Sequence, residues 1–543
     1  MTDGGSGPLT GAPAWEAVVV GAGVAGLVAA RELTRAGLRT LVLDERDTPG
    51  GAVRGHDVAG LRLDAGAESY ATRNGSVAAL LADLGLAEDV VAPEPRGAWT
   101  HLTSGDGPLP RTGLLGVPAY PLTPDVRRTL GTAGALRAAL DLVLPARVGA
   151  RATTLGGLVR ARMGRAVVTR LVHPVVGGVH AADPDDLAVD AAAPGLREAR
   201  AAAGGSLARA VRRLRASAPA GSAVEGVAGG VHRLVDALVA DVTAHGGVVL
   251  TGTRAESVTR AADGTLVVGT QDRHRPPRPS RDLRTQRLVV ATPGAARVLD
   301  GLDGADLRDV RLDDGAPVTL VTLVLDAPAL DAAPRGTGVL VGPGVDDVRA
   351  KALTHATAKW AWVADAAGPG RHVVRLSYGR AGGTPADGAD GRDHGATTPD
   401  RDALPDGPAL VDLALRDATT LLGVPLGRAQ LRGSAVVRWT QSLPRPSAAH
   451  RAAVAAVRAA AAGMPGVAVC GAWAAGNGLA SVVPDARAAA AALLAEAPVE
   501  PSTEPSPEPP TEPPTEPPTG VEDDAVVDGT DPSPSTPTPP DAA

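Results

Sequence analysis

The folded part of the chain opens on a regular succession of apolar and polar stretches. Residues 17–20 form a short apolar run that ends at Gly21, residues 27–33 carry mostly the small apolar side chains of a buried helix, and residues 41–43 form a second apolar run. A buried strand that leads through glycines into a helix and then into another buried strand is typical of a parallel βαβ unit. The pattern therefore predicts an α/β layer at the start of the fold.

Further along the chain the pattern changes character. Alternating strands and helices recur in the last part, whereas residues 91–223 have a mainly helical pattern and residues 300–438 are rich in strands. We therefore expect one discontinuous α/β domain from residues 15–90, 224–299 and 439–497, with a helical domain and a strand-rich domain between its pieces. At 543 residues the chain is also too long for a single hydrophobic core.

The two ends of the chain have the composition of segments without a core. Residues 1–14 are polar and glycine-rich, without the basic and apolar parts of a signal peptide, and residues 498–543 consist largely of Pro, Thr, Ser and acidic residues. We expect both ends to be disordered, the second partly as polyproline II. This C-terminal tail holds eleven acidic and no basic residues, so the remainder is mildly basic although the whole chain carries a net charge of -7.

Composition also narrows the location and the partners. The single cysteine, Cys470, can form no disulfide within the chain, and no apolar run is long enough to cross a membrane. These features favour a cytoplasmic protein whose contact with a membrane is at most peripheral. Residues 271–286 are dense in Arg and Pro, but without interleaved aromatic residues they indicate a solvated hairpin tip rather than a nucleic-acid site.

Three glycines follow the first predicted strand with the spacing of a dinucleotide-binding turn. Gly21 permits the tight turn, Gly23 lets a pyrophosphate approach the main chain, and Gly26 lets helix and strand pack closely. The second strand ends at Asp44, whose carboxylate can accept hydrogen bonds from a ribose diol. An isolated GxGxxG in a glycine-rich chain is more often a loop, but here the strands, the helix and the acid are in register, which predicts a bound dinucleotide.

The residues after Asp44 distinguish a flavin from a nicotinamide. Residues 44–53 resemble the second FAD signature of the flavin amine oxidase superfamily, in which a pair of glycines, here Gly50 and Gly51, begins six residues after the acid. The arginine that usually precedes this pair by two residues is Thr48 in this chain. The resemblance implies non-covalent FAD and an α/β fold of the flavin amine oxidase and p-hydroxybenzoate hydroxylase type. Such a fold combines a discontinuous Rossmann-like FAD-binding domain with a mixed β-sheet substrate domain and, here, a helical domain and a disordered C-terminal tail.

Three longer passages resemble one branch of that superfamily. Residues 63–86, 173–187 and 470–482 are similar to passages of the porphyrinogen oxidases, the flavin enzymes of haem synthesis. The resemblance covers nearly all of residues 15–495 in the right order. Two departures are the alanine at position 480, where a proline is usual, and residues 446–450, which replace a usual Tyr-x-x-Gly-His.

The resemblance implies roles for particular residues. The main-chain carbonyl near Gly178 would accept a proton from the substrate, and a bend beside the cofactor is the alternative role for this glycine. The residues implied to contact FAD are Gly21, Gly23, Val24, Ala25, Gly26, Asp44, Glu45, Gly50, Gly51, Ala65, Gly66, Ala67, Glu68, Val258, Gly471, Gly476, Gly478, Leu479 and Ala480.

Carboxylate-binding residues are suggested by the use of lysine. The only two lysines in a chain that otherwise uses arginine, Lys351 and Lys359, lie close in sequence and beside two tryptophans. A lysine offers a compact charge where the planar fork of arginine does not fit, so we expect these lysines, or Arg73, to pair with substrate carboxylates. Chance clustering of two lysines is the alternative. The histidines that could either move protons or make structural hydrogen bonds are His180, His355 and His450.

The resemblance implies oxidation of coproporphyrinogen III to coproporphyrin III, with molecular oxygen as the acceptor and no metal. A substrate with four carboxylates suits a mildly basic folded part better than a dicarboxylate that partitions into membranes, which leaves protoporphyrinogen IX as the second candidate. A flavin amine oxidase, a carotenoid desaturase and a redox-inert scaffold that docks a ferrochelatase are further alternatives. A ferrochelatase is also a candidate partner of the active enzyme.

Overall fold

A computed structural model describes residues 15–110, 113–180, 183–216, 223–273, 281–313, 315, 317–379, 404–439 and 447–496. The chain divides into one compact unit that ends at Glu500 and a second that begins at Pro501, and all of the described residues belong to the first. The expected N-terminal segment 1–14 and C-terminal tail 498–543 lie outside the described residues. None of the helices in the described part is long and apolar enough to cross a membrane.

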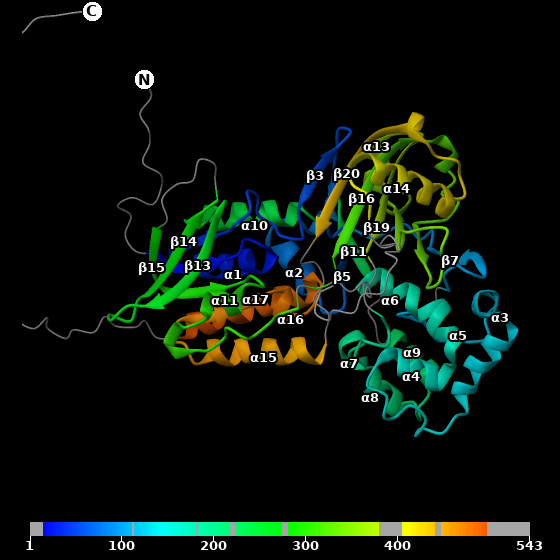
Figure 1. Cartoon of the computed structure of the whole chain (residues 1–543), viewed down its shortest axis with the longest axis horizontal. Coiled ribbons are helices and arrows are strands. Elements are labelled where there is room, and N and C mark those ends of the chain that lie inside the picture. Colours follow the sequence, from blue (N-terminus) through cyan, green and yellow to red (C-terminus); the bar gives the residue numbers. More distant parts are fainter. Residues whose placement is uncertain are drawn as a thin grey trace, which may run out of the picture. The chain divides into compact units, whose positions relative to one another are not determined.

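The first sheet is the predicted α/β layer, and it draws strands from three distant parts of the chain (Figure 1). Parallel pairing joins β1 to both β2 and β15, and β21 to the other side of β15, whereas β13, β14 and β15 form an antiparallel meander. The expected hairpin at 271–286 is the β14–β15 connection, whose tip lies outside the described residues. The strands are β1 (Trp15–Val20), β2 (Thr40–Leu43), β12 (Val248–Leu250), β13 (Thr253–Arg260), β14 (Leu266–Asp272), β15 (Arg281–Val290) and β21 (Val467–Val469).

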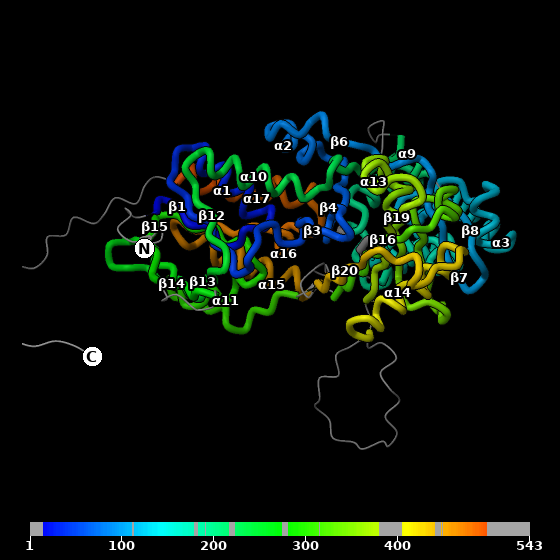
Figure 2. Tube along the Cα trace, turned by 90° about the horizontal axis from the view of Figure 1, so that it is seen from above, coloured from blue at the N-terminus to red at the C-terminus, as the bar shows by residue number. Residues whose placement is uncertain are grey.

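Helices cover both faces of this sheet because the strands are apolar on both sides. Ala17 and Val19 of β1 face one core with α1 (Val24–Arg35), α10 (Arg233–Ala244) and α17 (Leu479–Ala495), whereas Val18 and Val20 face a second core. The second core includes residues of α11 (Ala295–Leu299) and α15 (Ala448–Ala462). Figure 2 shows α1 beside α10 and α17, which are its main helical neighbours.

The second sheet has the order β20-β16-β19-β18-β17-β7-β8. Helix α14 (Gly407–Leu422) packs on one face, and α12 (Ala356–Lys359) and α13 (Ala361–Ala367) pack on the other, near the hairpin of β3 (Gly55–Val58) and β4 (Leu61–Asp64). The strands are β7 (Trp99–Leu102), β8 (Gly105–Pro108), β16 (Val318–Asp326), β17 (Gly338–Val341), β18 (Ala352–His355), β19 (Arg371–Tyr378) and β20 (Leu431–Trp439).

The region expected to be mainly helical, 91–223, begins differently from the expectation. Its strands β7 and β8 join the second sheet, because β7 pairs in parallel with β17. The helices and short helical turns that follow are α3 (Pro124–Ala139), η2 (Leu140–Leu142), α4 (Leu155–Met163), α5 (Arg165–Val167), the π-helix η3 (Val168–Val172), α6 (His173–His180), α7 (Val189–Ala192), α8 (Leu196–Ala202) and α9 (Leu207–Ala216).

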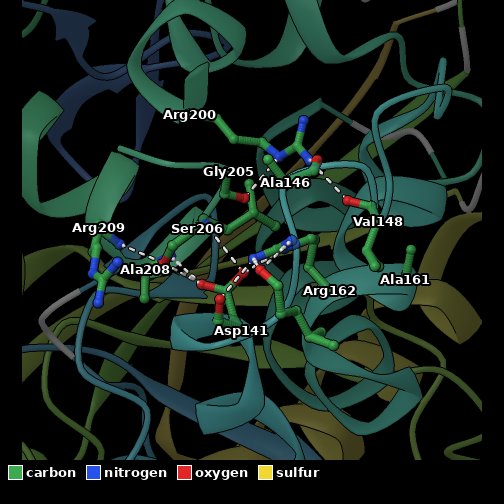
Figure 3. Close-up of polar contacts among 12 residues, drawn as sticks. Asp141, Ala146, Val148, Ala161, Arg162, Arg200, Gly205, Ser206, Ala208 and Arg209 are labelled. Atoms are coloured by element: carbon green, nitrogen blue, oxygen red, sulfur yellow. Dashed lines mark hydrogen bonds and ion pairs between the residues drawn. The ribbon is translucent and has the colours of Figure 1, made fainter. Parts of the chain in front are cut away.

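A fully buried ion pair ties these helices together (Figure 3). Arg162 Nε donates to Asp141 Oδ1 over 2.7 Å, and neither side chain has any exposed surface. Asp141 also accepts hydrogen bonds from the Ser206 hydroxyl and from the main-chain N–H groups of Leu207 and Ala208, which begin α9. The carboxylate therefore caps a helix while it neutralises a buried cation, and both functions are structural.

Short elements complete the fold. A three-stranded sheet pairs β11 with both β5 and β6, and a small hairpin joins β9 and β10. The remaining elements are β5 (Tyr70–Ala71), β6 (Val90–Val91), β9 (Gly113–Leu114), β10 (Val117–Pro118), β11 (Val224–Val227), α2 (Ser76–Asp83), α16 (Ala472–Ala475) and the 3-10 turns η1 (Ala87–Asp89), η4 (Leu302–Gly304), η5 (Pro328–Leu330) and η6 (Arg428–Gln430).

Candidate functional site

The glycine-rich turn after β1 forms a cradle at the start of α1. Gly21 has a φ of +103°, and a Cβ on Gly26 would lie 1.8 Å from the Gly21 carbonyl oxygen, so both positions require glycine. In the described part of the chain, in contrast, a Cβ on Gly23 would meet nothing within 4 Å, and no side chain caps the N-terminus of α1. Open space in front of uncapped N–H groups suits an anionic group such as a diphosphate.

The second glycine pair lies directly against this turn. The Gly50 N–H donates to the Ala22 carbonyl oxygen over 2.7 Å, and a Cβ on Gly51 would lie 3.5 Å from the Gly23 Cα. The structure thus brings the two predicted FAD signatures into contact, together with Val24 and Ala25 in the first turn of α1.

Asp44 is fixed at the edge of the same cradle. Its Oδ2 accepts a hydrogen bond from the Ala22 N–H (2.7 Å) and its Oδ1 accepts one from the Arg46 N–H (2.9 Å). Each carboxylate oxygen keeps a second lone pair with which it could accept a ribose hydroxyl. Its neighbour Glu45 is exposed and lies 3.6 Å from the guanidinium of Arg254.

Val258, which the resemblance assigns to FAD, lies in the middle of β13. Its side chain is buried in the sheet's second core, and it is paired with Val268 of β14. Asp44 is bonded instead to residues near the start of β13. The Asp44 N–H donates to the Leu250 carbonyl oxygen over 3.0 Å, and the Thr253 N–H donates to the Asp44 carbonyl oxygen over 2.7 Å.

The passage 64–68 closes against the second glycine pair. A Cβ on Gly66 would lie 2.1 Å from the Ala52 carbonyl oxygen, and the Ala67 and Ala65 N–H groups donate to Ala52 and Arg54. Asp64, at the start of this passage, accepts hydrogen bonds from His232 Nδ1 and from the His232 main chain, both over 2.9 Å. Sequence reasoning missed this buried pair, since the two residues lie far apart along the chain.

Glu68 forms the centre of a charged cluster that links the 64–68 passage to α12 and to β19 of the second sheet. Its Oε1 accepts from Lys359 Nζ over 2.6 Å and its Oε2 accepts from Arg375 over 2.7 Å. Arg375 also donates to the carbonyl oxygens of Asp64 and Gly66. Although burial acts in the opposite direction, the two cations hold the pKa of the Glu68 carboxyl at about 2.

This cluster changes the environment expected around Lys359. Trp360 is almost fully buried, and the hollow that it lines beside Glu68 has a volume of only about 30 Å³. Such a hollow holds about one water molecule and is far smaller than a tetrapyrrole requires. Lys351 is 6% exposed at the edge of β18, where its main chain bonds to Ser377 and Val341.

The loop of residues 471–478, which follows β21, ends at the start of α17 and lies beside Arg73. Gly476 and Gly478 have positive φ values, and a Cβ on either would meet none of the described residues within 4 Å. Arg73, which is exposed, donates to the Ser481 hydroxyl over 2.5 Å. At the other end of the loop, the Gly471 N–H donates to Asp485 over 3.0 Å, whereas Leu479 and Ala480 are buried in the core around α1.

Gly178 lies in the last turn of α6, and α6 itself follows the π-helix η3 directly. A Cβ on Gly178 would lie 2.7 Å from Leu340 Cδ2 of β17, so the glycine permits close packing against the second sheet. The main chain is helical here, without the bend that sequence reasoning offered as an alternative. Carbonyl groups in the last turn of a helix lack partners within that helix, which leaves this carbonyl as a candidate acceptor.

Two of the three candidate histidines make structural hydrogen bonds. His450 Nδ1 accepts from the Asp313 N–H, and its Nε2 lies 2.9 Å from the Trp473 carbonyl oxygen. His355 is fully buried against His372. His180 ends α6, and its side chain lies outside the described part. Cys470 is buried, which raises the pKa of its thiol and disfavours a reactive thiolate.

Comparisons with known proteins agree with this geometry. The family model described as flavin-containing amine oxidoreductase matches residues 24–494. A coproporphyrinogen III oxidase of Mycobacterium tuberculosis is 28% identical over 480 residues, 86% of this chain and 94% of its own, and one from Propionibacterium freudenreichii subsp. freudenreichii is 29% identical over 359 residues, 60% and 66%.

The fold is shared with solved structures. A crystal structure from Exiguobacterium sp. 255-15, provisionally named as a protoporphyrinogen oxidase, superposes with a TM-score of 0.71 at 23% identity and covers 89% of this chain and 99% of its own. These findings confirm the predicted fold class and the resemblance to porphyrinogen oxidases. The converging glycine segments fit the flavin that the family carries, and the chain belongs to the flavin-containing amine oxidoreductase family.

Proposed function

We propose that the protein oxidises coproporphyrinogen III to coproporphyrin III, a six-electron dehydrogenation, with non-covalent FAD as cofactor and molecular oxygen as acceptor. The observation that carries the proposal is the meeting of the two glycine segments beside Asp44, in a chain similar over 480 residues to coproporphyrinogen III oxidases. Each of three successive two-electron steps would reduce one oxygen molecule to hydrogen peroxide.

Each part of the site has a definite task in this proposal. The uncapped start of α1 and Gly51 would hold the diphosphate, Asp44 the ribose, and the 64–68 passage with the loop 476–480 the rest of the cofactor. A bound flavin supplies hydride acceptance and electron transfer to oxygen. The Gly178 carbonyl oxygen would take the proton that leaves the substrate with each hydride, and the close packing of Gly178 on Leu340 would fix its position.

Recognition of four carboxylates favours coproporphyrinogen III over protoporphyrinogen IX. Arg73 is exposed and its described partner is the neutral hydroxyl of Ser481, so its positive charge is not compensated there. The Glu68 cluster contains two cations and one carboxylate, and Lys359 would therefore attract a substrate carboxylate only as part of this cluster. We assign Lys351 the weakest role, since its chain is bonded within the second sheet.

The experiment for the reaction is a direct assay. Purified protein is incubated with coproporphyrinogen III, protoporphyrinogen IX and a panel of amines, while porphyrin fluorescence and peroxide are followed. We expect coproporphyrin III to form fastest, with about three peroxides per porphyrin. Faster oxidation of protoporphyrinogen IX would make that compound the assigned substrate. Oxidation of amines alone would show that the protein is not a porphyrinogen oxidase.

The experiment for the cofactor is a glycine substitution. In Gly23→Val a branched side chain would fill the open space in front of α1, so the purified variant should lose its bound flavin. Gly107→Val is the matched control, because its Cβ also meets nothing within 4 Å but lies in β8. Acid precipitation of the wild type should release FAD, and flavin retained in the pellet would contradict non-covalent binding.

The proposed setting is the cytoplasm, which suits a chain with one buried cysteine. A ferrochelatase that accepts the released porphyrin is the candidate partner. Co-purification or a saturable change in product release on addition of a ferrochelatase would support this assignment, and independence of the two enzymes at all ratios would contradict it.

A further inference from the structure

A cavity at one end of the second sheet has no place in the chemistry above. It has a volume of about 480 Å³ and lies where β18 ends and β19 begins, with walls from η5 and from the turn after α13. None of the residues assigned above to FAD or to substrate carboxylates lines it. We call it the edge cavity; its charged and imidazole side chains are Arg96, Asp331, His355, Asp365, Arg371 and His372.

Two of these side chains already have partners. Arg371 donates to Asp326 over 3.2 Å, and His372 Nε2 lies 2.8 Å from Asp331 Oδ1. Asp326 also pairs with Arg432, so Arg371 shares its carboxylate with a second arginine. Arg371, His372 and Asp331 are thus already held by protein contacts and are less available to a ligand than a side chain without such a contact.

Two others, Arg96 and Asp365, are exposed, and their side chains have no charged partner among the described residues. Among the residues that the structure describes, neither the Arg96 guanidinium nor the Asp365 carboxylate makes an ion pair or a side-chain hydrogen bond, and the two do not pair with each other. One cavity thus presents an uncompensated cation and an uncompensated anion at separate points of its wall. A ligand complementary to both must itself carry one group of each sign.

A buried imidazole, His355, also belongs to the cavity lining. His355 is fully buried, and its Nδ1 has no hydrogen-bond partner among the described residues. Burial, and then the nearby His372 and Arg96, lower the pKa of His355 to about 3, so the ring is neutral.

The hydrogen bonds from Asp331 through His372 to His355 decide whether His355 Nδ1 is a donor or an acceptor when both rings are neutral. The Asp331 carboxylate can only accept, so His372 Nε2 carries the proton and His372 Nδ1 accepts. His355 Nε2, which lies 3.0 Å from His372 Nδ1, must therefore donate. His355 Nδ1 is left as a buried acceptor without a donor among the described residues, which costs free energy, but it has no surface that a ligand could contact.

We propose that the edge cavity binds a small amino-carboxylate, with the carboxylate of the ligand on Arg96 and its ammonium group on Asp365. An ammonium group has three N–H donors, enough for both oxygens of one carboxylate. The volume falls within the range of small-molecule sites, roughly 300 to 1,000 Å³. This site is independent of the proposed oxidase reaction, and its occupancy can be measured without turnover.

Isothermal titration calorimetry of the flavin-loaded full chain tests the proposal. The probes are glycine, L-alanine and L-leucine, with acetate and ethylamine as ligands that carry only one of the two groups. We expect at least one amino acid to bind, with acetate and ethylamine weaker by about tenfold or more, since each loses one charge-assisted contact. Absence of binding by all three amino acids, or equal binding of acetate, would overturn the proposal.

Two exposed substitutions locate the site without threatening the fold. Arg96→Ala and Asp365→Asn should each weaken amino-acid binding by about tenfold, whereas flavin content should not change. Arg308→Ala and Asp306→Asn are the matched controls, because these residues form an exposed pair with each other and do not line the cavity. Unchanged affinity in either Arg96→Ala or Asp365→Asn would overturn the assignment.

Discussion

Glu68 shows how a single carboxylate can redirect the role of a conspicuous residue. Lys359 stands out in the sequence as one of two lysines, but its ammonium group lies 2.6 Å from Glu68, and Arg375 holds the other oxygen over 2.7 Å. Because Arg375 also binds the carbonyls of Asp64 and Gly66, the cluster fastens a predicted flavin-contacting passage to the second sheet. Lys359 is thus already paired with a carboxylate of the protein, and its charge is not free for a substrate carboxylate.

The Glu68 cluster predicts a particular loss of stability in acid. The pKa of Glu68 is about 2 in the folded state against an ordinary value of 4.5. The ion pairs therefore stabilise the fold fully above pH 4.5 and lose this contribution as the pH falls toward 2. Between about pH 5.5 and about pH 2.5, the wild type should lose on the order of 2 kcal/mol more unfolding free energy than Glu68→Gln.

Urea unfolding of both proteins across this pH range measures the difference. Glu88→Gln serves as the control, since Glu88 is exposed and makes no ion pair with any described residue. Equal acid losses in the wild type and in Glu68→Gln would show that the cluster contributes nothing to the pH dependence.

Arg73 predicts the effect of a carboxylate contact on catalysis. If its uncompensated charge meets a substrate propionate, Arg73→Ala should raise KM for coproporphyrinogen III by about tenfold without loss of flavin. Rising salt should weaken the wild type more than the variant, because screening acts on a contact that the variant lacks. Arg308→Ala is the control for general surface charge. Wild-type KM and salt dependence in Arg73→Ala would remove this residue from the substrate site.

At the scale of elements, α17 contains a proline, and a side chain from elsewhere in the chain replaces the hydrogen bond that this proline cannot make. Pro484 has no N–H with which to bond the carbonyl of Ala480, four residues earlier. The amide of Asn74 donates to that carbonyl oxygen over 2.6 Å instead. The loop after β5 thereby completes the first turns of α17, beside the expected flavin loop. Sequence reasoning missed Asn74, which lies 406 residues from Ala480 along the chain.

A double-mutant cycle tests this substitution of one donor for another. Asn74→Ala should lower the unfolding free energy by about 1 to 3 kcal/mol, because it leaves the carbonyl with only the long 3.4 Å contact from the Ser76 hydroxyl. In Pro484→Ala the restored main-chain N–H can take over, so Asn74→Ala should cost about 1 kcal/mol less in that background. Urea unfolding of the four proteins gives the coupling, and strict additivity would rule out the shared carbonyl.

Local elements could be predicted from the sequence, and long-range pairs could not. The turn at Gly21 and Gly26, the strand that ends before Asp44 and the glycine pair at Gly50 each depend on neighbours within a few tens of residues, and spacing alone indicates their geometry. Arg375 lies 307 residues from Glu68 along the chain, so no local pattern could join them. The only signal was indirect, in that an arginine occupies an otherwise uncharged stretch of β19.

At the scale of the whole molecule, positive charge is concentrated in the helical region. Residues 113–216 contain fifteen arginines and seven acidic residues, although the chain as a whole is acidic. The same region exposes apolar side chains at the end of α3 and beyond, where Leu136 is 57%, Leu140 48% and Val143 78% exposed. Their spacing of four and then three residues places them on one side of a helical segment.

Exposed apolar side chains within a basic region predict binding to anionic membrane surfaces. The full chain should co-sediment with vesicles of phosphatidylcholine and phosphatidylglycerol at low salt, and binding should fall as salt screens the arginines. Combined replacement of Leu136, Leu140 and Val143 by Ser should weaken binding by about tenfold or more, because serine has little apolar surface to bury in the membrane. Leu494→Ser is the control, because Leu494 is exposed on α17, outside this region. Equal binding to neutral vesicles, or no effect of the triple replacement, would show that the region does not meet membranes in this way.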